Sequence, residues 1–160
     1  MDDMNTIPKD EQGGHQAMNT DYEGTKQTDY VKGHLYPIQH TSNHDAMLAT
    51  STLTNAAPQE EKFNNGAWKS HEGALRKLYT PDNPVYIVTG VVPGKGTIGT
   101  GVRVAQVYWS AYCCLNCKIK SEGYWGPENN GQVVTLTLSQ LEARLTILDN
   151  MQFSVFGEQC

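Results

Sequence analysis

Long apolar runs, a secretion signal and glycosylation sequons are all missing from this 160-residue chain. No stretch of eighteen consecutive apolar residues occurs, so the sequence encodes no transmembrane helix and indicates no membrane partner. The N-terminus, Met-Asp-Asp-Met-Asn, lacks the basic and apolar regions of a signal peptide. The absence of Asn-x-Ser/Thr leaves the compartment without a glycosylation marker. The length is that of one domain with its own core.

Cysteine is absent before position 113, and all four cysteines lie at Cys113, Cys114, Cys117 and Cys160. Cys114 and Cys117 form a single CxxC without a second pair, which disfavours a zinc site. Disulfides are expected instead if the protein is exported, and their pairing stays open, since a segment upstream of this chain could supply one or more partners.

A nucleotide-binding loop is also missing. Residues 93–101 are rich in glycine, but they lack Walker A spacing. They follow a β-type run, and no helix is predicted directly after them, whereas a phosphate-binding loop leads into a helix. We interpret this stretch as a hairpin connection.

The net charge of −5 argues against a polyanion ligand, but the charge is unevenly distributed. Residues 1–31 hold seven acidic and two basic side chains, whereas residues 62–120 hold two acidic and eight basic ones. A basic segment behind a site could line a phosphate backbone. A scattered, solvated set of surface cations is the equally open alternative.

Sequence patterns predict a strand at 30–36, a short helix at 41–49 capped by Ser42 or Asn43, and a second strand at 51–56. A turn is expected at 58–61 and a helix at 62–79, which Pro81 and Pro84 end. Asn64, Trp68, Glu72 and Arg76 recur every four residues on one face of that helix. Further along, the patterns predict strands at 85–92, 102–115 and 133–138, a polar loop at 121–131, and a helix at 140–150 capped by Ser139.

Four motifs follow one another in this region: Lys-Gly-His at 32–34, Asn-Ala-Ala-Pro-Gln at 55–59, Asn-Asn-Gly-Ala-Trp at 64–68, and Glu72. Their order and spacing resemble the DNA/RNA non-specific endonucleases of the ββα-metal type, and most of all the endonuclease domain-containing 1-like proteins. That family has Asp-Arg-Gly-His, Asn-x-x-Pro-Gln, Asn-x-Gly-x-Trp and a downstream Glu. Val31 and Lys32 stand here where the family has the aspartate and the arginine.

The resemblance implies an α+β fold, in which a ββα-metal nuclease core at about residues 29–79 lies on a mostly antiparallel sheet flanked by helices. It divides the chain into a polar lead at 1–15 and an endonuclease-like domain at 16–160. Because family members are typically secreted and begin with a signal and several further strands, we expect an N-terminally truncated form of the domain. Family membership favours an extracellular protein, although this chain contains no signal peptide.

The resemblance also assigns the chemistry, which is metal-dependent hydrolysis of phosphodiester bonds in DNA or RNA without sequence specificity. His34 would be the general base, since an imidazole pKa near 6.5 suits proton abstraction at neutral pH. Asn64 would ligate one hydrated Mg²⁺, or another divalent cation such as Mn²⁺, and Glu72 would hold its waters. Lys32 would stabilise the charge on the phosphate. Arg76 would contact Glu72 or a phosphate, and Asn55 would orient the site.

These residues also have structural interpretations, and His34 taken alone could be a structural histidine. Asn64 could be a helix cap, and Glu72 with Arg76 could be an ordinary surface ion pair. His40 and His44 are interpreted as solvent-exposed loop histidines. The alternative function is a nuclease-fold module that binds nucleic acid or protein with weak or no catalysis, because lysine lacks the planar fork with which arginine grips two phosphate oxygens.

Overall fold

The computed structural model describes residues 16–24, 29–128, 131–157 and 160. The predicted polar lead at 1–15 lies outside the described residues, so its division from the domain stays a prediction. Within the described ranges, no helix has both the length and the apolar character needed to cross a bilayer.

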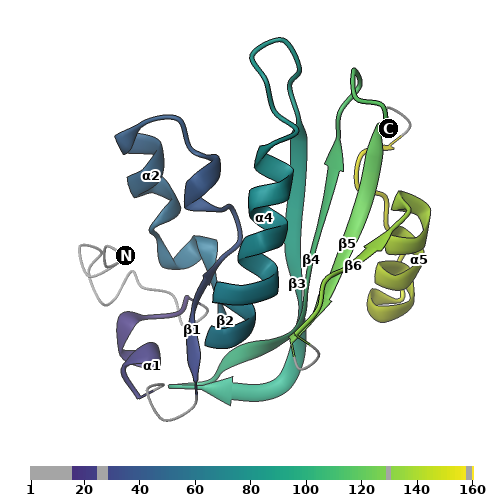
Figure 1. Ribbon diagram of the computed structural model, residues 1–160. Helices are drawn as coiled ribbons and strands as arrows, with labels where there is room; N and C mark the ends of the chain where they lie inside the picture. The colour runs from purple at the N-terminus through teal and green to yellow at the C-terminus, as the bar shows by residue number, and fades with distance from the viewer. Residues whose placement is uncertain (1–15, 25–28, 129–130, 158–159) are drawn as a thin grey trace.

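A strand pair followed by a helix forms the first structural unit (Figure 1). Strand β1 (Tyr30–His34) pairs antiparallel with β2 (Ala56–Glu60), and the connection between them contains η3 (Ile38–His40), α2 (His44–Thr50) and η4 (Leu53–Asn55). After β2 the chain continues through α3 (Glu61–Phe63), η5 (Asn64–Trp68) and α4 (Lys69–Arg76). This strand, connection, strand, helix order is the predicted ββα unit.

A four-stranded antiparallel sheet forms the centre of the molecule. It contains β3 (Tyr86–Ile98), β4 (Val102–Cys113), β5 (Ser121–Pro127) and β6 (Val134–Leu136), in that order. The ββα unit covers one face and α5 (Leu138–Asp149) covers the other, while α1 (Asn19–Glu23) lies beside β1 (Figure 1). The mixed fold with antiparallel strands agrees with the predicted class.

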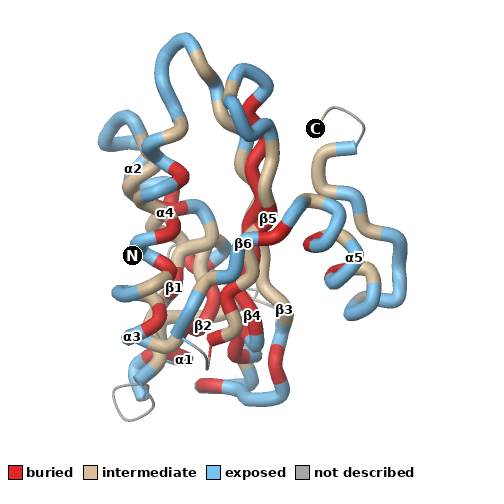
Figure 2. The backbone as a smooth tube through the Cα atoms, turned by 45° about the vertical axis from the view of Figure 1, so that its right-hand side comes forward, coloured by how far each residue is buried: buried red, intermediate tan, exposed pale blue. Residues whose placement is uncertain are grey.

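Alternation along β4 explains how one strand serves both layers, because successive side chains of a strand point to opposite faces. Tyr108 packs with Phe63 and Trp68 of the ββα unit. Its neighbour Trp109 packs with Leu141 and Leu145 of α5. Figure 2 shows buried residues following the central strands, with exposed segments on the outer helices.

The second predicted strand was placed too early in the chain. Residues 53–55 form a 3-10 turn, and the strand occupies Ala56–Glu60, where the sequence predicts a turn at 58–61. Pro58 sits within it, paired with Lys32. Proline is tolerated here because β2 pairs with a single strand, so one of its edges needs no ladder hydrogen bond.

The predicted polar loop at 121–131 is also wrong, since Ser121–Pro127 is strand β5, paired along β4. Its glycines look like loop residues in the sequence, but here they make room for neighbouring side chains. A Cβ on Gly123 would lie 2.7 Å from Leu141, and one on Gly126 would lie 2.6 Å from Phe63. The need for glycine at these two positions is visible only once the sheet is packed against its neighbouring layers.

Helix ends and hairpins differ from the predictions in detail. Asn43 caps α2 as one of the two predicted residues, through a 2.9 Å bond from the Ala46 N–H to its side chain. Helix α5 begins earlier than expected and is capped by Thr137 instead of Ser139, in a reciprocal pair with Gln140. The glycine-rich stretch joins β3 to β4 as expected, but β3 continues to Ile98 and the turn is confined to 99–101.

All four cysteines are paired within the chain, as Cys113–Cys160 and Cys114–Cys117. Of the pairings that the sequence left open, the structure has those within the chain, and none of the four cysteines is left for an upstream partner. The single CxxC is a disulfide here, in agreement with the preference for disulfides over zinc.

Candidate active site

Three of the predicted site residues meet at one pocket. His34 at the end of β1, Asn64 at the start of η5 and Glu72 in α4 line a hollow of about 190 Å³. Pro37, Ile38 and Gln39 form its wall on the connection after β1, and Asn65 and Lys69 complete it from the helix. The ββα arrangement therefore brings the end of a strand and the inner face of a helix together around one small polar space.

A π-type turn explains why Asn64 and Glu72 face the same pocket. Residues eight apart in a regular α-helix point about 80° away from each other, because the turn contains 3.6 residues. The η5 segment has i→i+5 geometry, which uses more residues per turn and offsets that drift. Gly66 carries the irregularity, with φ −102° and ψ −105°.

His34 is half-buried, and its Nε2 is a buried nitrogen without a hydrogen-bond partner among the described residues. Burial lowers the pKa of His34, so the imidazole is neutral around pH 7. Buried polar atoms are normally hydrogen-bonded, and an unpartnered one beside a pocket indicates a position where water or a substrate atom completes the bonding. A neutral imidazole is also the form that can accept a proton.

The carboxyl of Glu72 has the opposite shift. Burial raises its pKa to about 7, while a hydrogen bond from the Gln39 amide and the positive charge of Lys69 partly offset this. Gln39 Nε2 donates to Glu72 Oε2 at 3.1 Å. Because the carbonyl of Glu72 can only accept, His40 Nε2 must donate its proton to it, over 2.9 Å. Glu72 is thus held from the side chain and from the backbone by one connection, residues 37–42.

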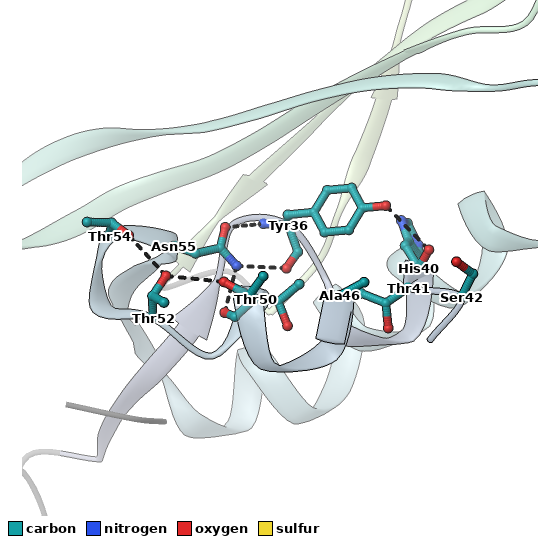
Figure 3. Close-up of a pocket in the computed structure, with 10 residues that line it drawn as sticks. Tyr36, His40, Thr41, Ser42, Ala46, Thr50, Thr52, Thr54 and Asn55 are labelled. Carbon is teal, nitrogen blue, oxygen red and sulfur yellow. Dashed lines mark hydrogen bonds between the residues drawn. The ribbon is translucent and has the colours of Figure 1, made fainter. Parts of the chain in front are cut away.

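Asn55 lies outside the pocket and holds the chain after β1 in place. Its Oδ1 accepts from the Tyr36 N–H, and its Nδ2 donates to the carbonyls of Tyr36 and Thr50, each at 2.9 Å (Figure 3). A backbone bond from the Leu35 N–H to the Asn55 carbonyl adds to this link. Asn55 therefore fixes the residues immediately after His34 without lining the pocket.

Lys32 and Arg76 also lie away from the pocket lining. The Lys32 ammonium donates to the side chain of Asn19 and lies 5.5 Å from the ring centre of Tyr22, both in α1. Arg76 is exposed and lines a separate hollow one turn further along α4. The four-residue rhythm from Asn64 to Arg76 therefore does not place all of its members at one site.

The sequence predicted three of the eight pocket residues; it did not predict Pro37, Ile38, Gln39, Asn65 or Lys69 as site residues. Lys69 lies three positions before Glu72, a spacing that places helical residues on neighbouring positions of one face, so the sequence held a usable signal. Gln39 lies 33 positions before Glu72 and is joined to it only by the fold.

The arrangement of β1, β2 and the η5–α4 helix on an antiparallel sheet defines a ββα-metal nuclease fold. A solved chain of the EndoG/EndoGI complex shares it, with a TM-score of 0.62 and 24% sequence identity, over 79% of this chain and 60% of that chain. At that identity the likeness establishes the fold.

The chain belongs to the DNA/RNA non-specific endonuclease family, whose profile matches residues 6–156. It is 36% identical to human endonuclease domain-containing 1 protein over 106 residues, which are 64% of this chain and 20% of that protein. The mouse protein of the same name is 30% identical over 78% of this chain and 24% of its own length. Human mitochondrial endonuclease G is 36% identical over 48% of this chain and 25% of its own length. The matched region thus spans about a fifth to a quarter of each of these relatives.

Proposed function

We propose that the chain is a divalent-metal-dependent, sequence-non-specific endonuclease that hydrolyses phosphodiester bonds of DNA or RNA. The observation that carries the proposal is the shared pocket of His34, Asn64 and Glu72. The membership of the nuclease family supports the reaction class.

The residues present fit a single, largely hydrated Mg²⁺. Asn64 offers an amide oxygen and Glu72 a carboxylate, which are hard oxygen donors of the kind that this ion prefers. Among the described residues, no cluster of three or more His, Cys, Asp and Glu side chains forms an all-protein metal cage. Asn64 would ligate the ion, with Glu72 holding its waters; Mn²⁺ suits the same donors. Bound there, the ion would supply positive charge to the phosphoryl oxygens.

His34 would take a proton from the attacking water, because its pKa is lowered and the ring is neutral. Lys69 would attract the substrate phosphate to the pocket that it lines. Asn55 acts at a distance, since it fixes the connection that follows His34. Lys32 would stabilise the phosphoryl charge after release from Asn19, and Arg76 would contact a neighbouring phosphate.

A second candidate function is nucleic-acid binding without cleavage. The contact of Lys32 with Asn19 and Tyr22 favours it, because that cation is held outside the pocket lining. The two functions differ in whether bound nucleic acid is cut.

Nicking of supercoiled plasmid by the purified protein tests the proposal. The assay compares the rate in Mg²⁺ with the rate in EDTA, which removes the metal. His34→Ala should lower the rate by about 10²–10⁴-fold, which is the usual contribution of general base catalysis. His44→Ala is the matched control, since His44 is exposed in α2 and does not line the pocket. Equal cleavage by the His34 variant and the unsubstituted protein would exclude His34 as the base. A folded protein that binds but does not nick would favour the second function.

A further inference from the structure

A groove lies beside the candidate active site, on the other side of the connection that holds Glu72. Two neighbouring hollows, of about 550 and 430 Å³, share Tyr36, His40, Thr41 and Ser42 among their lining residues. The second hollow continues to Arg76 and Tyr79 at the end of α4. We call the two hollows together the tyrosine groove. Their volumes lie in the range of about 300–1,000 Å³ that small-ligand sites occupy.

The groove presents aromatic surface to solvent. Tyr36 is 44% exposed and Tyr79 is 59% exposed. The Tyr36 ring is held in place, since its hydroxyl donates to the His40 carbonyl at 3.3 Å and its edge meets the His40 ring at 6.0 Å between centres (Figure 3). His40 is in turn bonded to the Glu72 carbonyl. The groove therefore has a fixed aromatic wall, built on the same bonds that hold the candidate site.

The charge of the groove suits a polyanion. Among the described residues that line it, Arg76 is cationic and none is acidic. Arg76 follows Glu72 by four residues on α4, which is about 6 Å along the helix axis. That distance is less than two steps of a stacked strand, at about 3.4 Å each, so the groove lies within one or two nucleotides of the candidate active site.

We propose that the tyrosine groove is a nucleobase-binding subsite, in which an unpaired base next to the cleaved bond stacks on Tyr36 and Tyr79 while Arg76 meets the adjoining phosphate. The inference rests on the proposed nucleic-acid substrate. It implies that the protein prefers nucleic acid that is single-stranded or locally unpaired. Aromatic side chains bind bases of any sequence in this way, because every base has a stacking face. A sequence-non-specific enzyme requires that tolerance.

Fluorescence anisotropy tests the subsite. It measures binding of a fluorescein-labelled single-stranded DNA of about ten nucleotides, in EDTA so that the strand is not cut. An abasic strand of the same length is the comparison ligand. Tyr36→Ala and Tyr79→Ala should each weaken binding of the base-containing strand about tenfold and leave the abasic strand within about twofold. Tyr36→Phe should bind within about twofold of the unsubstituted protein, because it keeps the stacking ring and its contact with the His40 ring and loses only the hydroxyl bond.

Tyr86→Ala is the matched control, since Tyr86 is 58% exposed but lies outside the groove lining. Equal loss of affinity for the two strands, or none for either, would overturn the proposal. If Tyr36→Ala does not fold, Tyr79→Ala decides, together with quenching of a 2-aminopurine base in the strand by the unsubstituted protein. No cutting is needed, so failure of the nuclease proposal and failure of the subsite give different results.

Discussion

The amide of Gln39 donates a 3.1 Å hydrogen bond to the carboxylate of Glu72, joining the connection after β1 to the middle of α4. Burial raises the pKa of Glu72 to about 7, and the bond from Gln39 acts in the opposite direction, so that the pKa would be higher without it. The link makes the protonation of Glu72 depend on a residue that takes no part in the chemistry.

Cleavage should rise with pH through about 7, because the proposed reaction needs Glu72 ionised and His34 neutral, and the pKa of His34 is lowered. Gln39→Ala removes a bond to the charged form of Glu72, so its pKa should rise further and the ascending limb should move to higher pH. A rate profile from pH 5 to 9 measures the midpoint. Gln106→Ala, an exposed change on β4, should leave it in place. A downward shift in Gln39→Ala would contradict the assignment of Glu72.

Lys69→Ala should raise KM several-fold and reduce the slope of log affinity against log salt by about 1, as expected when one phosphate contact is lost. Lys62→Ala is the comparison, because Lys62 is exposed in α3 and does not line the pocket. Titrations at several salt concentrations measure the slope. Identical slopes in the two variants would show that Lys69 contributes only general surface charge.

Gly33→Ala should destabilise the protein by about 1–3 kcal/mol, the usual cost of overpacking. A Cβ at Gly33 would lie 2.4 Å from Oε1 and 2.6 Å from Cβ of the fully buried Gln59. Gly73→Ala should have the opposite sign, stabilising by up to about 1 kcal/mol, because Gly73 is helical and its Cβ would meet only Gln39, at 3.8 Å. Urea denaturation measures both. If Gly33→Ala left the free energy of unfolding unchanged, β1 and β2 would be able to move apart without an energetic cost.

Removal of the two disulfides should have unequal effects on stability. Cys113 and Cys160 are 47 positions apart, whereas Cys114 and Cys117 are 3 apart. In the loop-entropy account, replacing the first pair by alanine should cost about 4 kcal/mol, and replacing the second about 2 kcal/mol. Unfolding midpoints without reductant test the order. A larger loss for the Cys114–Cys117 pair would point to a structural role of that clip beyond chain entropy.

The sequence by itself determined the order of elements in the ββα unit and its helix, because helix period and proline stops are local signals, whereas it placed the second strand at 51–56 instead of Ala56–Glu60. Motif order also predicted His34, Asn64 and Glu72 as partners, and they share one pocket. The roles assigned to these residues stay predictions for the experiments above.

Tertiary structure decided what depends on residues far apart in the chain. Strand β5 pairs along β4, and its glycines make room for Leu141 on one face of the sheet and Phe63 on the other, although the same glycines look like a loop in the sequence. Gln39 reaches Glu72, Arg76 turns toward the tyrosine groove, and Lys32 is held by Asn19. Periodicity describes one element at a time, whereas the direction in which a side chain points into a site is fixed by the elements packed against it.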